Sequence, residues 1–233
     1  MSRVANQYNP VYDFKIENFN DYLFLPSKHV HWDLPDKPGN YIICLNKGVE
    51  LPHYGFDVKY STLQDKKVLY TGIGESLRNR DYKQHFSGNA GSSTLRLSIG
   101  VLLGYERIYR DKNKIKRKFK FHANHENELS IWMKENLVMY YLTGDNCSEI
   151  EKFLIKTLNP PLNLRGNTNR DNFDFRKKLT SLRTSKIEEE EHSQNRTVEQ
   201  VDAAKPNISF KSILKVIAFL YVLFRLIDFL ISR

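Results

Sequence analysis

The chain has 233 residues, enough for one domain with a real hydrophobic core and some appended segments. Its 36 lysines and arginines exceed its 27 aspartates and glutamates, and the resulting formal charge of +9 favours an anionic partner, either nucleic acid or an anionic membrane surface. The two cysteines, Cys44 and Cys147, can build neither a disulfide framework nor a zinc-binding spacing. The opening segment MSRVANQYNPVYDFKIENFN does not resemble a secretory signal, so we expect the folded part to stay in the cytosol.

Predicted strands and helices alternate along the first 165 residues. Short apolar runs bounded by glycine, proline and asparagine predict strands at 40–46, 67–71 and 137–142, and a strand pair within 107–121. Apolar side chains at helical spacing predict helices at 75–86, 94–103, 126–134 and 148–158. The last of these helices must end before Pro160 and Pro161.

One stretch, YTGIGESLRNRDYKQH, concentrates side chains suited to phosphate chemistry. A predicted strand ends at Tyr70, and the following helix presents Arg80 and His85. Tyrosine can position or deprotonate a water, arginine can stabilise charge on a phosphate, and a carboxylate can hold a divalent cation. Tyr41 upstream and Glu151 downstream complete a set of residues that suits phosphodiester hydrolysis.

The order and spacing of these residues resemble the GIY-YIG nuclease family. The two family tripeptides correspond to Gly39-Asn40-Tyr41 and Tyr70-Thr71-Gly72, and Arg80 stands ten positions after the second tyrosine, as the family arginine does. The helix that contains Glu151 and ends in Pro160-Pro-Leu-Asn163 is similar to the family's glutamate helix. The segment HFSGNAGSSTLRLSIGVLL also resembles a subgroup of small bacterial members.

The resemblance covers roughly residues 28 to 165, with about ten extra residues between the two tripeptides and three departures at single positions. Asn40 and Thr71 replace the usual isoleucines inside predicted strands, where they bear on packing more than on chemistry. Ile73 stands where some members carry a lysine, so no role of that lysine transfers to this chain.

The resemblance implies an α/β (α+β) domain with a small, mainly antiparallel sheet flanked by helices, and an endonuclease that uses Mg²⁺ or Mn²⁺. Tyr41 would position or deprotonate the attacking water, and Tyr70 would hydrogen-bond in the same pocket. Arg80 would neutralise the transition state, and Glu151 would bind the metal, because one carboxylate with waters and a phosphate oxygen fits Mg²⁺. His85 is assigned as a proton carrier or phosphate contact on the helix of Arg80.

Each assignment has a structural alternative. Tyr41 and Tyr70 lie in predicted buried strands, where aromatic side chains commonly serve packing alone. A helical histidine such as His85 is often only a satisfied surface group. Ser148-Glu149-Ile150-Glu151 matches a capping box, in which the carboxylate of Glu151 would bond to the helix N-cap amide instead of a metal.

Basic side chains near this site predict contacts with the phosphate backbone of nucleic acid, which we expect to be DNA. Arg78 and Lys83 lie on the helix of Arg80, and eight basic residues interleave with aromatic and aliphatic ones between Arg107 and Lys120. The side chains assigned to nucleic-acid binding are Arg78, Lys83, Lys114, Lys116, Arg117 and Lys118. A solvated basic face is the alternative for all of them.

Composition divides the chain into an N-terminal extension (1–27), a nuclease-like domain (28–165), a polar flexible linker (166–207) and a hydrophobic helix (208–231). The last segment contains an uninterrupted apolar run at 216–224. With Lys211 and Lys215 before the run and Arg225 after it, a spanning helix, an interfacial helix and an ordinary packed helix are all open.

We expect membrane anchoring through Ile208–Ile231, with the catalytic domain on the cytosolic side because basic residues cluster before the apolar run. Such an enzyme would suit defence against incoming DNA. The competing hypothesis is a catalytically degenerate protein that binds nucleic acid or acts as a membrane scaffold.

Overall fold

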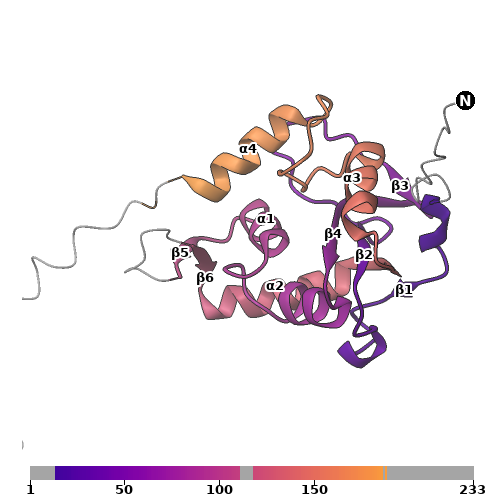
Figure 1. Cartoon of the computed structure of the whole chain (residues 1–233). Coiled ribbons are helices and arrows are strands. Elements are labelled where there is room, and N and C mark those ends of the chain that lie inside the picture. The colour runs from indigo at the N-terminus through magenta and orange to yellow at the C-terminus, as the bar shows by residue number, and fades with distance from the viewer. Residues whose placement is uncertain (1–13, 111–117, 186, 188–233) are drawn as a thin grey trace, which may run out of the picture. The chain divides into compact units, whose positions relative to one another are not determined.

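The computed structural model describes residues 14–110, 118–185 and 187 (Figure 1). The chain divides into two compact units, 1–187 and 188–233, and the described residues all belong to the first. The predicted linker beyond residue 187 and the predicted membrane helix 208–231 therefore lie outside the described residues. Within the described part, no helix combines the length and the apolar character needed to cross a membrane.

A five-stranded sheet forms the centre of the unit, with strand order β1-β7-β2-β4-β3 and antiparallel pairing between every pair of neighbours. Its strands are β1 (Leu23–Phe24), β2 (Gly39–Leu45), β3 (Thr62–Leu63), β4 (Lys66–Gly74) and β7 (Leu137–Thr143). A separate hairpin pairs β5 (Arg107–Tyr109) with β6 (Phe119–Phe121). The fold prediction, a small antiparallel sheet flanked by helices, is confirmed.

Helices pack on both faces of this sheet (Figure 1). They are η1 (Ile16–Phe19), η2 (His31–Asp33), η3 (Arg78–Phe86), α1 (Thr94–Leu102), α2 (Ala123–Asn136), α3 (Cys147–Leu158) and α4 (Phe173–Thr184).

Side chains alternate across the central strand β2. Tyr41, Ile43 and Leu45 join a buried cluster with residues of α1, α2 and α4. Ile42 and Cys44 join a second cluster with residues of η1 and α3. All seven residues of β2 are buried, as expected for a strand covered on both faces, and the alternation places Tyr41 on the face of η3 and α1.

The compact unit extends past the predicted domain boundaries at residues 28 and 165. On the N-terminal side, β1 pairs with β7, and Phe19 and Phe24 are buried. On the C-terminal side, α4 lies beside α1 (Figure 1) and buries Phe175 and Leu179. These two apolar positions are one helical turn apart within a segment of polar average composition, so composition alone does not indicate a packed helix there.

Candidate active site

The register of β2 against β4 brings the two family tyrosines together. Tyr41 pairs with Gly72 and Ile43 pairs with Tyr70, so the tyrosines are diagonal neighbours on one face of the sheet. Their ring centroids are 6.2 Å apart. Gly72 is required by this arrangement, because a Cβ atom there would lie 2.4 Å from the Tyr41 hydroxyl oxygen.

The predicted helix after β4 is a π-helix, η3, whose wider turn carries Arg80 and His85. Its last turn shows the i to i+5 pattern, because the Ser87 amide donates to the Tyr82 carbonyl at 2.9 Å. The His85 Nε2 atom lies 2.8 Å from the Tyr41 hydroxyl oxygen, and both side chains are fully buried. His85 is therefore part of a buried aromatic cluster and not a surface histidine.

Burial keeps this histidine neutral. It lowers the pKa of His85 to about 3, and the positive charges of Arg80 and Arg96 act in the same direction. A neutral imidazole has one donor nitrogen and one acceptor nitrogen, so its two hydrogen bonds must differ in kind.

The third element, α3, supplies Glu151. The helix begins at Cys147 with Asn146 as its N-cap, so Glu151 lies in the second turn and not at the position that a capping box requires. The competing capping interpretation is therefore wrong. Burial raises the pKa of the Glu151 carboxyl, and the positive charge of Arg80 opposes that rise, which indicates that the two side chains are close enough to interact.

The segment after α3 fixes this helix against β4. The Asn163 side chain accepts from the Thr71 amide at 2.9 Å and donates to the Thr71 carbonyl at 2.8 Å. The Leu162 amide also donates to the Leu69 carbonyl at 3.0 Å. These three bonds hold the end of the glutamate helix beside the strand of Tyr70.

The departures from the family pattern at Asn40 and Thr71 have hydrogen-bond partners in the fold. The buried Asn40 side chain donates to the Cys147 carbonyl at 2.8 Å and so ties β2 to the start of α3. The buried Thr71 hydroxyl donates to the Tyr41 carbonyl at 2.9 Å. Ile73, at the position of the family lysine, is exposed.

The half-buried residues of the predicted site line one cavity of about 1080 Å³. Tyr70, Arg80 and Glu151 all line it. The fully buried Tyr41 and His85 are not among the described residues that line this cavity. The structure thus brings all five predicted catalytic residues into one region but exposes only three of them to a substrate.

Four basic side chains that the sequence analysis did not single out line the same cavity: Lys152, Lys156, Arg165 and Arg183. The first two are one turn apart on α3, and Arg183 comes from α4, which lay in the predicted linker. Helical spacing from Glu151 would not have indicated the two lysines, because they follow it by one and five residues and not by three or four. Nothing local in the sequence indicated Arg183, whose position depends on the packing of α4.

The predicted nucleic-acid contacts fall in several places. Arg78 bonds to the Leu34 carbonyl at 3.0 Å and stacks on Trp32, so its guanidinium already has structural partners. Lys83 and Lys118 are exposed. Lys114, Lys116 and Arg117 lie outside the described residues.

The donor chemistry around Glu151 fits a divalent cation that keeps much of its water. Within the described residues, no group of three or more His, Cys, Asp or Glu side chains could hold a metal ion. A single carboxylate beside a roomy polar cavity leaves coordination positions for waters and phosphate oxygens, which is the mode that Mg²⁺ favours.

This geometry agrees with comparison to known families. The family model of the GIY-YIG catalytic domain matches residues 39–185, which include the tyrosines, the arginine, the glutamate and α4. The chain belongs to the GIY-YIG family, a class of nucleases that generally use divalent metal ions. Comparison with curated proteins and with solved structures finds no match.

Proposed function

We propose that this protein is a divalent-metal-dependent endonuclease that hydrolyses phosphodiester bonds of DNA. The observation that carries the proposal is the convergence of Tyr70, Arg80 and Glu151 on one basic cavity within a GIY-YIG domain. The presence of all three groups argues against a degenerate site.

The cavity suits a nucleic-acid backbone. Arg80 can bind the scissile phosphate through two parallel hydrogen bonds, which neutralises charge as the transition state forms. Lys152 and Lys156 add positive charge next to it without fixing a base sequence.

Tyr70 and Tyr41 position and deprotonate the attacking water in this mechanism. Tyr70 faces the cavity and orients the water, whose oxygen attacks phosphorus while the bond to the leaving oxygen breaks. The water gives a proton to the Tyr70 hydroxyl, and Tyr70 passes its own proton to Tyr41 behind it. Tyr41 receives this proton as a tyrosinate, whose own hydroxyl proton has already gone to solvent and whose oxygen is bonded to His85. Glu151 would hold Mg²⁺ or Mn²⁺, which when bound supplies positive charge to the phosphate oxygens.

Glu151→Gln tests the proposal directly. The full-length variant should lose about 10²- to 10³-fold in plasmid cleavage measured with magnesium, because one charge-stabilising group typically contributes that much. Its melting temperature should not fall, because the wild-type carboxylate is partly desolvated at a cost to the fold. Cleavage by the wild type should stop in EDTA, and Glu149→Gln, at an exposed carboxylate on the same helix that does not line the cavity, serves as the matched control.

Two results would count against this function. Wild-type cleavage by Glu151→Gln would remove the metal assignment. A wild-type protein that binds DNA but cleaves none with Mg²⁺ or Mn²⁺ would favour the degenerate binding protein instead.

The proposed setting is the cytosolic face of a membrane, where the enzyme would meet incoming foreign DNA. The support is compositional: Ile208–Ile231 is mainly apolar, and Lys211 and Lys215 precede its uninterrupted run. Full-length protein should then sediment with membranes after a carbonate wash. Release by salt alone would favour an interfacial helix, because salt screens charge but not buried apolar area.

A further inference from the structure

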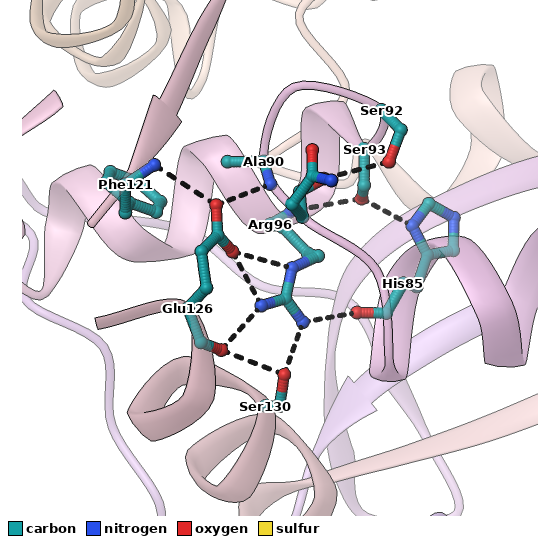
Figure 2. Close-up of polar contacts among 9 residues, drawn as sticks. His85, Ala90, Ser92, Ser93, Arg96, Phe121, Glu126 and Ser130 are labelled. Carbon is teal, nitrogen blue, oxygen red and sulfur yellow. Dashed lines mark hydrogen bonds and ion pairs between the residues drawn. The ribbon is translucent and has the colours of Figure 1, made fainter. Parts of the chain in front are cut away.

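A chain of buried polar side chains runs from Tyr41 through His85 to Ser93. The His85 Nε2 atom is 2.8 Å from the Tyr41 hydroxyl oxygen, and the His85 Nδ1 atom is 2.6 Å from the Ser93 hydroxyl oxygen (Figure 2 shows the second contact). All three side chains are at most 1% exposed. The imidazole therefore links a predicted catalytic tyrosine to a serine that has no place in the mechanism so far.

The bonds of Ser93 determine which nitrogen of His85 carries the proton. Ser93 is the N-cap of α1, and its oxygen accepts from the Arg96 amide at 3.1 Å. Among the described residues, its only other hydrogen-bond partner is His85 Nδ1. A hydroxyl has one proton to donate, and burying it without an acceptor is costly, so Ser93 donates to Nδ1.

The proton of the neutral imidazole must then be on Nε2, where it points at the Tyr41 oxygen. A donor in that place stabilises negative charge on the tyrosine oxygen. Tyr41 is then the tyrosinate, its own hydroxyl proton having gone to solvent, and in that form it can accept a proton that comes from the water. The opposite tautomer would leave the Ser93 proton without a partner and would make Tyr41 the donor.

The buried ion pair of Arg96 and Glu126 holds in place the segments that carry His85 and Ser93 (Figure 2). The Arg96 guanidinium donates to the His85 carbonyl at 3.0 Å and to Glu126 Oε2 at 2.8 Å. The other carboxylate oxygen, Glu126 Oε1, accepts from the amides of Ala90 at 2.9 Å and Phe121 at 3.1 Å. Arg96, on α1, thus ties the end of η3, which carries the His85 imidazole, to α2.

We propose that Ser93, held in place by Arg96 and Glu126, is a positioning residue that sets the His85 tautomer and so presents the Tyr41 oxygen as a proton acceptor. The inference rests on the proposed nuclease function. The groups that face His85 agree with it, because Arg80 and Arg96 disfavour a second proton on the ring, against which the rings of Tyr41 and Tyr70 pack.

The tautomer can be measured without any cleavage. Long-range ¹⁵N–¹H spectra of full-length protein, with His85 identified by its loss in His85→Phe, should show a single ring with the proton on Nε2. Ser93→Ala should give a mixture of tautomers, and Ser93→Thr should restore the single form. A wild-type ring protonated on Nδ1 would overturn the inference, even if the protein proves to be an active nuclease.

Kinetics then connects the tautomer to cleavage. Ser93→Ala should lower kcat about 10- to 100-fold with KM unchanged, the size typical of a residue that orients a functional histidine. Ser93→Thr should recover most of the rate, and Ser92→Ala, which changes the neighbouring exposed serine, should leave it unchanged. Ser93→Gly, which caps a helix nearly as well as serine, separates loss of the hydroxyl from loss of the cap.

A double-mutant cycle distinguishes positioning from mere support of the fold. In a His85→Phe background, Ser93→Ala should lower kcat by no more than about twofold, because its effect passes through the missing imidazole. Independent losses that multiply in the double variant would overturn the positioning role. If the wild type cleaves no nucleic acid, the proposed function fails, while the spectra still decide the tautomer.

Discussion

The cavity wall (Tyr70, Arg80 and Glu151) and the buried network (His85, Ser93, Arg96 and Glu126) keep their polar side chains in opposite environments. The wall holds Arg80 and Glu151 half-buried, where a substrate and a cation can still reach them. The network holds Arg96 and Glu126 nearly dry, and their charges are used on each other and on backbone groups. Charges that are to act on a ligand stay partly solvated, whereas charges that position other residues are fully paired.

His85 connects the buried network to the predicted site, because it touches Tyr41 on one side and Ser93 on the other. Burial lowers its pKa from an ordinary value of 6.5 to about 3. Because the cavity wall and the buried network differ in this way, we expect truncation, acid and salt to act on different parts of the site.

Truncation should have the largest effect, because α4 contributes to both regions. Ending the chain after residue 166 removes Phe175 and Leu179 from the core, which should cost about 3–6 kcal/mol in the free energy of unfolding at roughly 1.5–3 kcal/mol for each buried side chain. Ending it after Ile187 keeps α4 and should give a folded, active protein that no longer sediments with membranes.

Urea denaturation of the two truncated chains checks this prediction. Leu179→Ala and Phe173→Ala provide a matched pair within α4, since Leu179 is fully buried and Phe173 is 58% exposed. Equal stability of the two truncated chains would mean that α4 is dispensable and that the domain ends near residue 165.

Acid should act mainly on the buried network. The pKa of His85 is about 3 in the folded protein and near 6.5 when unfolded, so the unfolded chain binds the extra proton first as pH falls. Stability from this residue is complete above pH 6.5 and declines as the pH falls toward about 3, by roughly 3 kcal/mol at pH 4.5.

His85→Phe removes that titration and is the control. The wild-type free energy of unfolding, measured between pH 7 and pH 4.5, should fall more steeply than that of the variant. If the free energy of unfolding fell equally with pH in the wild type and the variant, the imidazole would not be held neutral in the folded protein. The buried network would then not differ from the cavity wall in the way proposed.

The sequence predicted the cavity wall better than the network, for a physical reason. Tyr70, Arg80 and Glu151 occupy positions whose spacing is set by strand register and helix turns, so a motif can identify them. Arg96 and Glu126 are 30 residues apart, and either could be a surface charge until the fold brings them together. The Glu151 capping box failed because the helix begins earlier than Ser148.

Salt should act on the wall alone, with the smallest effect. Replacing Lys152 and Lys156 with glutamine should reduce the slope of log binding constant against log salt by about 2, since each lost phosphate contact contributes roughly 0.9. Binding is best measured in the Glu151→Gln background, so that cleavage does not intervene. Glutamine at Lys28 and Lys177, which are exposed and do not line the cavity, removes the same charge and should leave most of the slope intact. If the cavity pair and the control pair lowered the slope equally, net charge alone would explain the attraction. The cavity would then not be the part of the surface that contacts the phosphate backbone.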